Sequence, residues 1–325
     1  MKILVTGGAG YLGSVLSLDL LRTGQEVRVF DNLMYGGRPV LALLGQDGFE
    51  FVRGDIRDKK AIRDALRDVD SVVHLAAIVG DPACARQPEL AKAVNVQATL
   101  DLVETAREAG VSRFVFASTC SNYGKMSDTS ILADENCEVR PLSLYAETKV
   151  AVEKEILELS ARPLAVTVLR FATLYGLSPR MRFDLTVNQF VMEMLTERRT
   201  VVYGELFWRP YVHVRDAARA IVAVLGAPQA AAAQQVFNVG DSRENYRKLD
   251  LVEIIQKRVG ACDVQFVHKA EDPRDYRVSF ERIRERLGYA VTRRVPDGVH
   301  EIANAIESGS LDDLGNPLYY NVKLA

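Results

Sequence analysis

The sequence predicts an α/β fold in which a doubly wound parallel sheet is covered by helices on both faces. Short β-branched runs alternate with amphipathic segments through the first half of the chain. These runs are apolar almost throughout, as strands buried on both faces must be. The first run leads into a loop with three regularly spaced glycines, which is typical of such sheets. We therefore expect six or seven parallel strands.

The expected elements follow one another in a regular order. The strands are expected at 2–6, 26–31, 49–55, 71–77, 113–119 and 164–171. The helices are expected at 10–22, 59–67, 88–108 and 143–159. After about Gly176 the connections become irregular and turn-rich, which indicates a smaller C-terminal lobe. We therefore predict a first domain at 1–176, to which about 205–245 return, and a lobe at 177–325.

Composition narrows the possible partners of the chain. Its 41 Lys and Arg nearly balance its 43 Asp and Glu, so the broad positive field of a nucleic-acid binder is not expected. No run of 18 apolar residues occurs, which argues against a membrane protein and favours a cytoplasmic location. The four cysteines form no CxxC pair, so we expect reduced thiols and no metal site. A small-molecule substrate is the expectation that remains.

The stretch "TGGAGYLG" follows the first predicted strand and precedes the first helix. Gly7 allows a tight turn, Gly10 lets backbone N–H groups approach a pyrophosphate, and Gly13 lets the helix pack closely. A plain strand-turn-helix junction would also contain glycines, but Asp31 ends the second strand where a carboxylate accepts ribose hydroxyls. This combination predicts a Rossmann-type, NAD-binding first domain and favours NAD over NADP. Further cofactor contacts are expected from Tyr11, Leu12, Asn32, Asp55, Ile56, Leu75, Ala76 and Ala77.

The segment "YAETK" places Tyr145 and Lys149 four residues apart in a predicted helix. Both side chains then lie on one face, about 6 Å apart. A tyrosine is a poor base at neutral pH, but a neighbouring ammonium and a bound nicotinamide would stabilise its phenolate. A surface tyrosine above a solvated lysine is the simpler interpretation of the motif alone. Together with the glycine loop and Asp31, the pair instead predicts that Tyr145 takes a proton from a sugar hydroxyl.

The chain resembles the extended short-chain dehydrogenase/reductase family, in particular its NAD-dependent nucleotide-sugar epimerases and dehydratases. The resemblance spans nearly the whole chain and rests on motifs that occur in order, namely "TGGAGYLG", Asp31, "GDIRD", "HLAA", "FASTCSNYG", "YAETK", "RFATLYG", "WRPYVHVRDAARAI" and "DPRDYRVS". It implies that Thr119 binds the hydroxyl being oxidised, that Tyr145 is the base, and that Lys149 lowers the pKa of Tyr145 and binds the nicotinamide ribose.

The resemblance also implies where the substrate binds. Arg209 and Arg274 match arginines that clamp the nucleotide diphosphate, and a guanidinium suits a phosphate well. Thr173 takes a place where many members have asparagine, which leaves the role of that position open. Arg180 and Arg182 follow a strand end and are predicted to hold phosphate or order the substrate loop, unless they form a basic loop facing solvent. Ser121 completes the predicted substrate-binding set.

The residues after Thr119 help to choose among reactions. Dehydratases of the family have Asp-Glu there as the acid and base, whereas this chain has Cys120 and Ser121. A 4-epimerase needs only Thr119, Tyr145, Lys149 and NAD, so 4-epimerisation of a nucleotide-diphosphate sugar through a 4-keto intermediate is the preferred interpretation. Net C4 oxidation or 4-keto reduction of a hexose or heptose stays open. So does a non-catalytic NAD-binding sensor.

Two long predicted helices, 88–108 and 143–159, carry apolar residues on more than one face. In the family the corresponding helices of two subunits form a four-helix bundle, so the resemblance implies a homodimer. The sequence leaves open which nucleotide and sugar are bound. It also assigns no role to Cys120 or to the segment "LGNPLYYNVKLA" that ends the chain.

Overall fold

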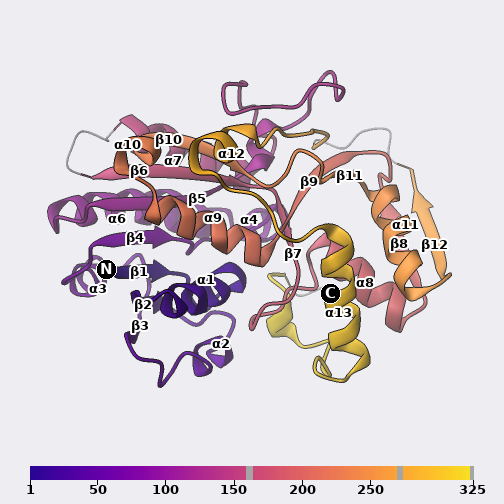
Figure 1. The fold of residues 1–325 in the computed structure, drawn as a ribbon, viewed down its shortest axis with the longest axis horizontal. Coiled ribbons are helices and arrows are strands. Elements are labelled where there is room, and N and C mark those ends of the chain that lie inside the picture. The colour runs from indigo at the N-terminus through magenta and orange to yellow at the C-terminus, as the bar shows by residue number, and fades with distance from the viewer. Residues whose placement is uncertain (159–163, 269–273, 323–325) are drawn as a thin grey trace.

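The computed structural model describes residues 1–158, 164–268 and 274–322. A parallel sheet of seven strands lies beside a smaller lobe (Figure 1). The expected doubly wound parallel sheet is therefore confirmed, and its strand number is the upper of the two expected values. Leu159, the last residue of the helix expected at 143–159, lies outside the described residues.

The large sheet has the strand order β3-β2-β1-β4-β5-β6-β10, and every neighbouring pair is parallel. Its strands are β1 (Lys2–Thr6), β2 (Glu26–Asp31), β3 (Phe49–Arg53), β4 (Ser71–His74), β5 (Arg113–Thr119), β6 (Ala165–Phe171) and β10 (Gln235–Val239). β1 and β4 begin two halves that wind outward in opposite directions from the centre. The carboxyl ends of the strands meet along one edge, where folds of this kind place their ligands.

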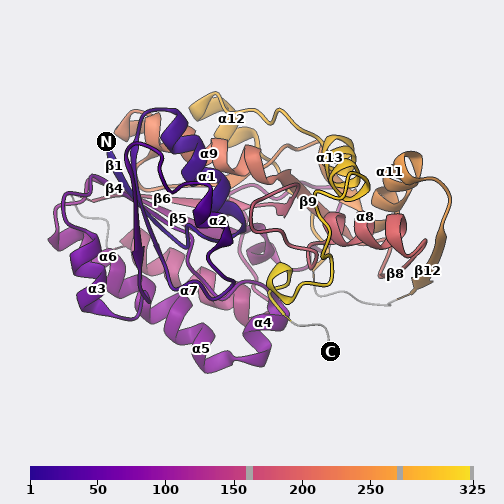
Figure 2. The ribbon, with the colours of Figure 1, turned by 90° about the horizontal axis from the view of Figure 1, so that it is seen from below.

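Two layers of helices cover the sheet (Figure 2). One layer contains α1 (Tyr11–Arg22) and α9 (Val214–Gly226), whose apolar side chains form one core cluster with residues such as Ile3 and Val115. The other contains α3 (Lys59–Ala65), α6 (Ala98–Glu108) and α7 (Leu144–Glu158), which pack on Leu4 and Phe114. Because alternate residues of each strand enter opposite clusters, both faces of the sheet must be apolar.

The helix expected at 88–108 is interrupted by one wider turn. It consists of α5 (Pro88–Lys92), a π-helical turn (Ala93–Gln97) and α6. Inside this turn the buried Asn95 accepts a hydrogen bond from Ile78 N at 2.8 Å and donates one to Ile78 O at 3.0 Å. Turns of this type often occur at functional sites, and here Asn95 fixes the loop that follows β4.

In the part of the chain that the structure describes, the smaller lobe contains a three-stranded sheet, a two-stranded sheet and three longer helices. Its elements are β7 (Thr173–Tyr175), β9 (Trp208–His213), β11 (Asn245–Arg247), β8 (Arg199–Tyr203), β12 (Asp263–Val267), α8 (Thr186–Thr196), α11 (Lys248–Val259) and α13 (Val295–Glu307). Between β9 and β11 the chain returns to the first domain through α9 and β10. Short helical segments complete the fold: α2 (Arg38–Leu41), α4 (Asp81–Arg86), η2 (Cys120–Tyr123), α10 (Gln229–Ala232), α12 (Glu281–Leu287) and η3 (Pro317–Tyr319).

Among the described residues, no helix is long and apolar enough to cross a membrane. All four cysteines, Cys84, Cys120, Cys137 and Cys262, are unpaired. Within the same residues, no group of three His, Cys, Asp or Glu side chains is arranged to hold a metal ion.

Candidate active site

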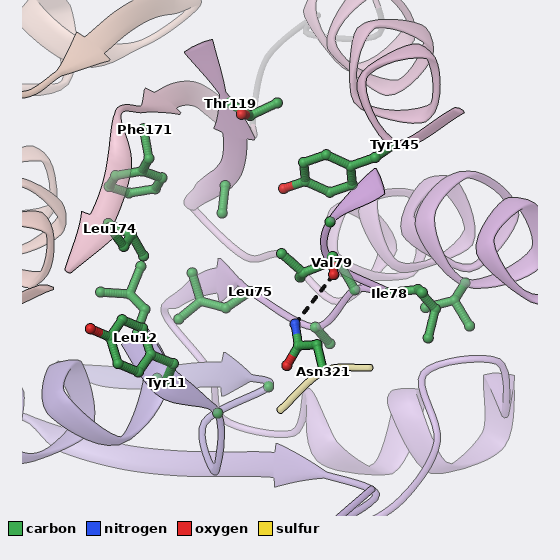
Figure 3. A pocket seen from close by; sticks show the side chains of 18 of the residues that line it. Tyr11, Leu12, Leu75, Ile78, Val79, Thr119, Tyr145, Phe171, Leu174 and Asn321 are labelled. Carbon is green, nitrogen blue, oxygen red and sulfur yellow. Dashed lines mark hydrogen bonds between the residues drawn. The ribbon is translucent and has the colours of Figure 1, made fainter. Parts of the chain in front are cut away.

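A cavity of about 380 Å³ lies at the carboxyl edge of the large sheet, between the first domain and the lobe (Figure 3). Every predicted cofactor, catalytic and substrate residue except Arg209 lines it. Residues that are far apart in the sequence therefore meet in one place, because parallel strands bring their carboxyl ends to the same edge.

At two glycines of the glycine loop, other backbone atoms lie too close to leave room for a side chain. Gly7 has a φ of +73°, and a Cβ atom added there would lie 2.7 Å from Ala76 N. A Cβ atom on Gly13 would lie 2.2 Å from Gly7 O. Neither position tolerates a side chain, so the loop stays tight and α1 begins directly behind it. The N-terminus of α1 faces the cavity with the backbone that a pyrophosphate requires.

Asp31 ends β2 and is bound to the glycine loop. Its carboxylate accepts hydrogen bonds from Ala9 N at 3.0 Å and from Leu33 N at 2.7 Å. Burial raises the pKa of this carboxyl, and the two N–H groups act in the opposite direction. At the same end of the cavity, hydrogen bonds from Arg57 hold the pKa of Asp55 at about 2. The carboxylates of Asp31 and Asp55 thus lie at the end of the cavity that suits a ribose and an adenine.

Tyr145 and Lys149 extend from α7 into the middle of the cavity. Lys149 Nζ lies 5.9 Å from the Tyr145 ring centroid and 4.7 Å from that of Phe116, and it donates a 2.8 Å hydrogen bond to Ala117 O. Burial lowers the pKa of Lys149 to about 8 and raises that of Tyr145 above its ordinary value. The lysine alone therefore does not make Tyr145 a base, so the remaining stabilisation of the phenolate must come from groups bound in the cavity.

A buried ion pair lies one helical turn beyond Lys149. Glu153 of α7 binds Arg170 of β6 through a 2.6 Å contact and accepts a 2.8 Å hydrogen bond from Asn122. It also accepts a hydrogen bond from Ser118, which precedes Thr119. Glu153, Arg170, Ser118 and Asn122 are all buried. The pair therefore ties α7 to the ends of β5 and β6.

Thr119 is the last residue of β5 and is 8% exposed. Its hydroxyl accepts a hydrogen bond from Ser121 N at 3.1 Å and lies at the cavity wall with Tyr145 (Figure 3). Cys120, in contrast, is buried away from the cavity lining, and its thiol donates to Arg170 O at 3.2 Å. Burial raises the pKa of this thiol well above its usual range. Cys120 therefore packs in the core and offers no acid or base to the cavity.

Arg180 is an unusual cation because it is 3% exposed and two of its donors face no acceptor. Its Nε and Nη2 atoms have no hydrogen-bond partner among the described residues, and its Cζ lies 4.0 Å from the Tyr35 ring centroid. Burial, with Arg182 as a second cause, lowers its pKa to about 10. A buried guanidinium with unsatisfied donors is costly unless it meets an anion, and this one lines the cavity.

The other predicted arginines have partners. Arg182 pairs with Asp184 at 2.8 Å, and Arg274 pairs with Asp81 at 2.8 Å. Arg209 does not line the cavity, and its role as a clamp of the nucleotide diphosphate stays a prediction. It is buried on β9, donates to Trp208 O at 2.7 Å and lies against the ring of Tyr276, a cavity residue. Thr173, on β7, lines the cavity.

The cavity also contains residues that motif reasoning missed. Tyr276 lies 3.4 Å, hydroxyl to hydroxyl, from Ser121, and Tyr35 lies beside Arg180. Both occur near predicted residues in sequence, two after Arg274 and four after Asp31, so local spacing could have suggested them. Asn321 also lines the cavity, but no motif surrounds it. Asp272 and Pro273 of the predicted "DPRDY" motif lie outside the described residues.

Comparisons with known proteins agree with this geometry. The sequence model of the NAD dependent epimerase/dehydratase family matches residues 3–240. A UDP-glucose 4-epimerase of Streptomyces lividans is 31% identical, covering 90% of this chain and 92% of the relative. A dTDP-glucose 4,6-dehydratase of Streptomyces niveus is 32% identical, with coverages of 93% and 91%.

A solved structure is also similar over nearly the whole chain. The UDP-glucose 4-epimerase of Thermus thermophilus, in complex with NAD, superposes with a TM-score of 0.82 at 29% identity. The similarity covers 94% of this chain and 99% of the other. The family match spans the glycine loop, β5 and α7. The chain therefore belongs to the NAD dependent epimerase/dehydratase family.

Proposed function

We propose that the protein is an NAD-dependent epimerase that inverts C4 of a nucleotide-diphosphate hexose through a 4-keto intermediate. The observation that carries this proposal is the convergence of Thr119, Tyr145 and Lys149 at one wall of the cavity, without an acid at position 120. A 4,6-dehydratase needs a further acid and base to remove water from the sugar, and Cys120 is buried elsewhere. Relatives of both kinds exist, and this difference favours the epimerases.

The cavity fits NAD. The tight turn at Gly7, the close approach at Gly13 and the carboxylate of Asp31 match the needs of a pyrophosphate and an unphosphorylated ribose. Asn32, Asp55, Ile56, Leu75, Ala76 and Ala77 complete the predicted cofactor contacts. NAD supplies the reversible two-electron oxidation of the sugar carbon when it is bound.

The side chains of the protein handle the proton. Thr119 accepts or donates a hydrogen bond at the 4-hydroxyl, and Tyr145 takes the hydroxyl proton and later returns it. Lys149 stabilises the phenolate of Tyr145 and keeps its ammonium in place through Ala117 O. Because both catalytic groups are buried, their charges act in a dry site where electrostatic stabilisation is strong.

Arg180 is assigned to the cofactor, and Arg182 and Arg274 are assigned to the sugar nucleotide. Arg180 lies against Tyr35 and acts electrostatically on Asp31, which favours the pyrophosphate of the cofactor over that of the substrate. Arg182 and Arg274 lie with Ser121, Thr173 and Tyr276 along the part of the cavity proposed for the nucleotide-diphosphate sugar. Arg209 supports that part from behind, through Tyr276.

A panel of nucleotide-diphosphate hexoses tests the proposal. Incubation without added NAD should give the C4 epimer, while absorbance at 340 nm stays flat at steady state. A steady rise in absorbance that requires added NAD would instead indicate net C4 oxidation, and consumption of NADH would indicate 4-keto reduction. Binding of NAD without turnover of any sugar would indicate a sensor.

The Tyr145→Phe variant should lose about 10²- to 10⁴-fold in kcat while it still binds NAD, because only the proton-transfer group is removed. Turnover is measured by chromatographic separation of the epimers, and NAD binding by calorimetry. Tyr203→Phe is a suitable control, since Tyr203 lies on β8 and is 51% exposed. Retention of full activity in Tyr145→Phe would exclude Tyr145 as the base.

A homodimeric assembly and a cytoplasmic location are further parts of the proposal. Val96 of the π-helical turn, Leu100 of α6, and Leu144 and Leu157 of α7 are only partly buried. Burial of these side chains in a four-helix bundle between two copies would give a homodimer, which sedimentation analysis can test. The four unpaired cysteines favour the reducing cytoplasm.

A further inference from the structure

Residues 317–322, which we call the strap, run from the lobe toward the loop after β4 (Figure 2). The strap begins with η3, and its Tyr319 is buried. Tyr320 packs against the core cluster that contains the lobe residues, whereas Val322 packs against the cluster on the other face of the large sheet. The strap therefore contacts both parts of the molecule that enclose the cavity.

On the lobe side, the strap is bound to the segment that carries Arg180 and Arg182. Phe183 N donates to Tyr319 O at 3.0 Å, and the two rings meet edge to face at 5.9 Å. Asn321 N donates to Asp184 Oδ2 at 3.2 Å. Burial acts to raise the pKa of Asp184, but Arg182 and this N–H group hold it below its ordinary value. The segment around Arg180 is thus bound to the strap through the carboxylate of Asp184, which stays ionised.

On the other side, the strap contacts two loops of the first domain. Asn321 Nδ2 donates to Val79 O at 3.2 Å, inside the cavity (Figure 3). The Leu318 side chain lies next to Gly36, where an added Cβ atom would be 3.3 Å from Leu318 Cδ1. These loops follow β4 and β2, the strands whose ends form the cofactor part of the site.

We propose that the strap retains the cofactor, with Asn321 as a positioning residue that holds the Arg180 segment and the β4 loop together. This inference rests on the proposed function, since an epimerase must keep its reduced cofactor until the keto sugar is reduced again. Release of NAD would require these two walls to separate, and the hydrogen bonds of Asn321 oppose that separation. The strap acts on the walls of the cavity and takes no part in proton transfer.

The contacts favour the cofactor over the sugar as the ligand that the strap retains. Its two partners in the first domain, Gly36 and Val79, lie in loops at the cofactor part of the cavity. In the lobe it is bound to Phe183 and to Asp184, which is paired with Arg182. The bond that an Asn321 variant would remove is therefore the one on the cofactor side. Within residues 1–158, 164–268 and 274–322, no hydrogen bond joins the strap to Ser121 or Tyr276, two of the residues proposed to face the sugar nucleotide. We therefore expect an effect on NAD release and little effect on the KM of the sugar.

The Asn321→Ala variant of the full chain tests this inference. It keeps the backbone bond to Asp184 but loses the bond to Val79 O. Loss of one hydrogen bond should make NAD release roughly two- to thirteenfold faster after removal of free NAD by gel filtration. The kcat at saturating NAD and the KM of the sugar should stay within about twofold. Asn321→Gln, which keeps an amide donor, should recover part of the slow release.

The control is Asn304→Ala on the exposed side of α13, which should release NAD at the parental rate. An unchanged release rate in Asn321→Ala would overturn the strap proposal. So would a raised KM of the sugar with parental NAD release. A parental protein that binds no NAD would overturn the proposed function itself, so the two failures can be told apart.

Hydrogen exchange of the intact protein gives an independent measurement that needs no variant. Backbone amides of residues 318–322 should exchange more slowly when NAD is bound, because the bound cofactor keeps the two walls together. Equal exchange with and without NAD would contradict the proposal.

Discussion

His74 is a buried residue that links β4 to the neighbouring strand β1 at the carboxyl ends of these strands. Its Nδ1 lies 2.7 Å from Thr6 Oγ1 on β1, and its Nε2 lies 2.9 Å from Thr99 Oγ1 on α6. Burial, together with the nearby Lys149, lowers its pKa to about 3. The ring is therefore neutral at physiological pH and serves as a hydrogen-bonding bridge beneath the glycine loop.

The pKa of His74 predicts a pH dependence of stability. The unfolded chain takes up a proton near pH 6.5, whereas the folded chain does so only near pH 3, so stability falls on acidification through this window. The contribution of His74 is about 1.4 kcal/mol per pH unit. Urea unfolding at pH 7, 6 and 5 should show a flatter curve for His74→Gln than for the parent. The exposed His300→Gln serves as the control, and equal curves for all three proteins would contradict the prediction.

At the scale of elements, α7 carries the proposed catalytic pair and also its anchor. Tyr145, Lys149 and Glu153 occur at intervals of four, so they lie along one face of the helix. The first two face the cavity, and the third is bound to Arg170 of β6. The position of the proposed catalytic groups therefore depends on a buried charge pair that is costly to break.

The Glu153→Gln variant should lose about 3–5 kcal/mol of unfolding free energy, because Arg170 would be left buried without its counter-charge. Glu138→Gln is a matched control. It removes the same charge from an exposed pair with Arg140 and should cost less than about 1 kcal/mol. Urea unfolding measures both variants, and similar losses would show that the buried pair has no special role.

At the scale of the whole molecule, one asparagine of the lobe is bound to the glycine loop. Asn188 of α8 accepts a 2.9 Å hydrogen bond from Gly176 N and donates a 3.1 Å bond to the hydroxyl of Tyr11. That hydroxyl in turn donates to Gly176 O at 2.6 Å. The two halves of the molecule thus share a buried polar contact that lies beside the cavity.

A double-mutant cycle can measure this contact between the halves. Asn188→Ala and Tyr11→Phe should show a coupling energy of about 0.5–3 kcal/mol in unfolding experiments, because they remove ends of the same hydrogen bond. Tyr289→Phe is the control, since the Tyr289 hydroxyl donates to Asp216 O and shares no partner with Asn188. Additive effects of Asn188→Ala and Tyr11→Phe would mean that the halves pack independently there.

Those cavity-lining residues that directly follow a strand or share a helix face could be predicted from the sequence. Asp31, Thr119 and Tyr145 belong to this class, because strand ends and helix periodicity place them without knowledge of the tertiary structure. Arg209 lies within β9, and its direction depends on how the lobe packs against Tyr276. Asn321 reaches the cavity only through the folded arrangement of both halves. Local patterns could predict neither of these two placements.

The position of β10 has a consequence for synthesis of the protein. β6 ends at Phe171, but its outer neighbour β10 ends at Val239, after most of the lobe sheet has been made. At the rate of ribosomal synthesis, β10 is complete about 3–14 s after β6. The apolar edge of β6 therefore stays unpaired during this time. An unpaired apolar strand edge invites association with other chains. The nascent chain is thus prone to aggregation until β10 pairs with β6 and completes the sheet.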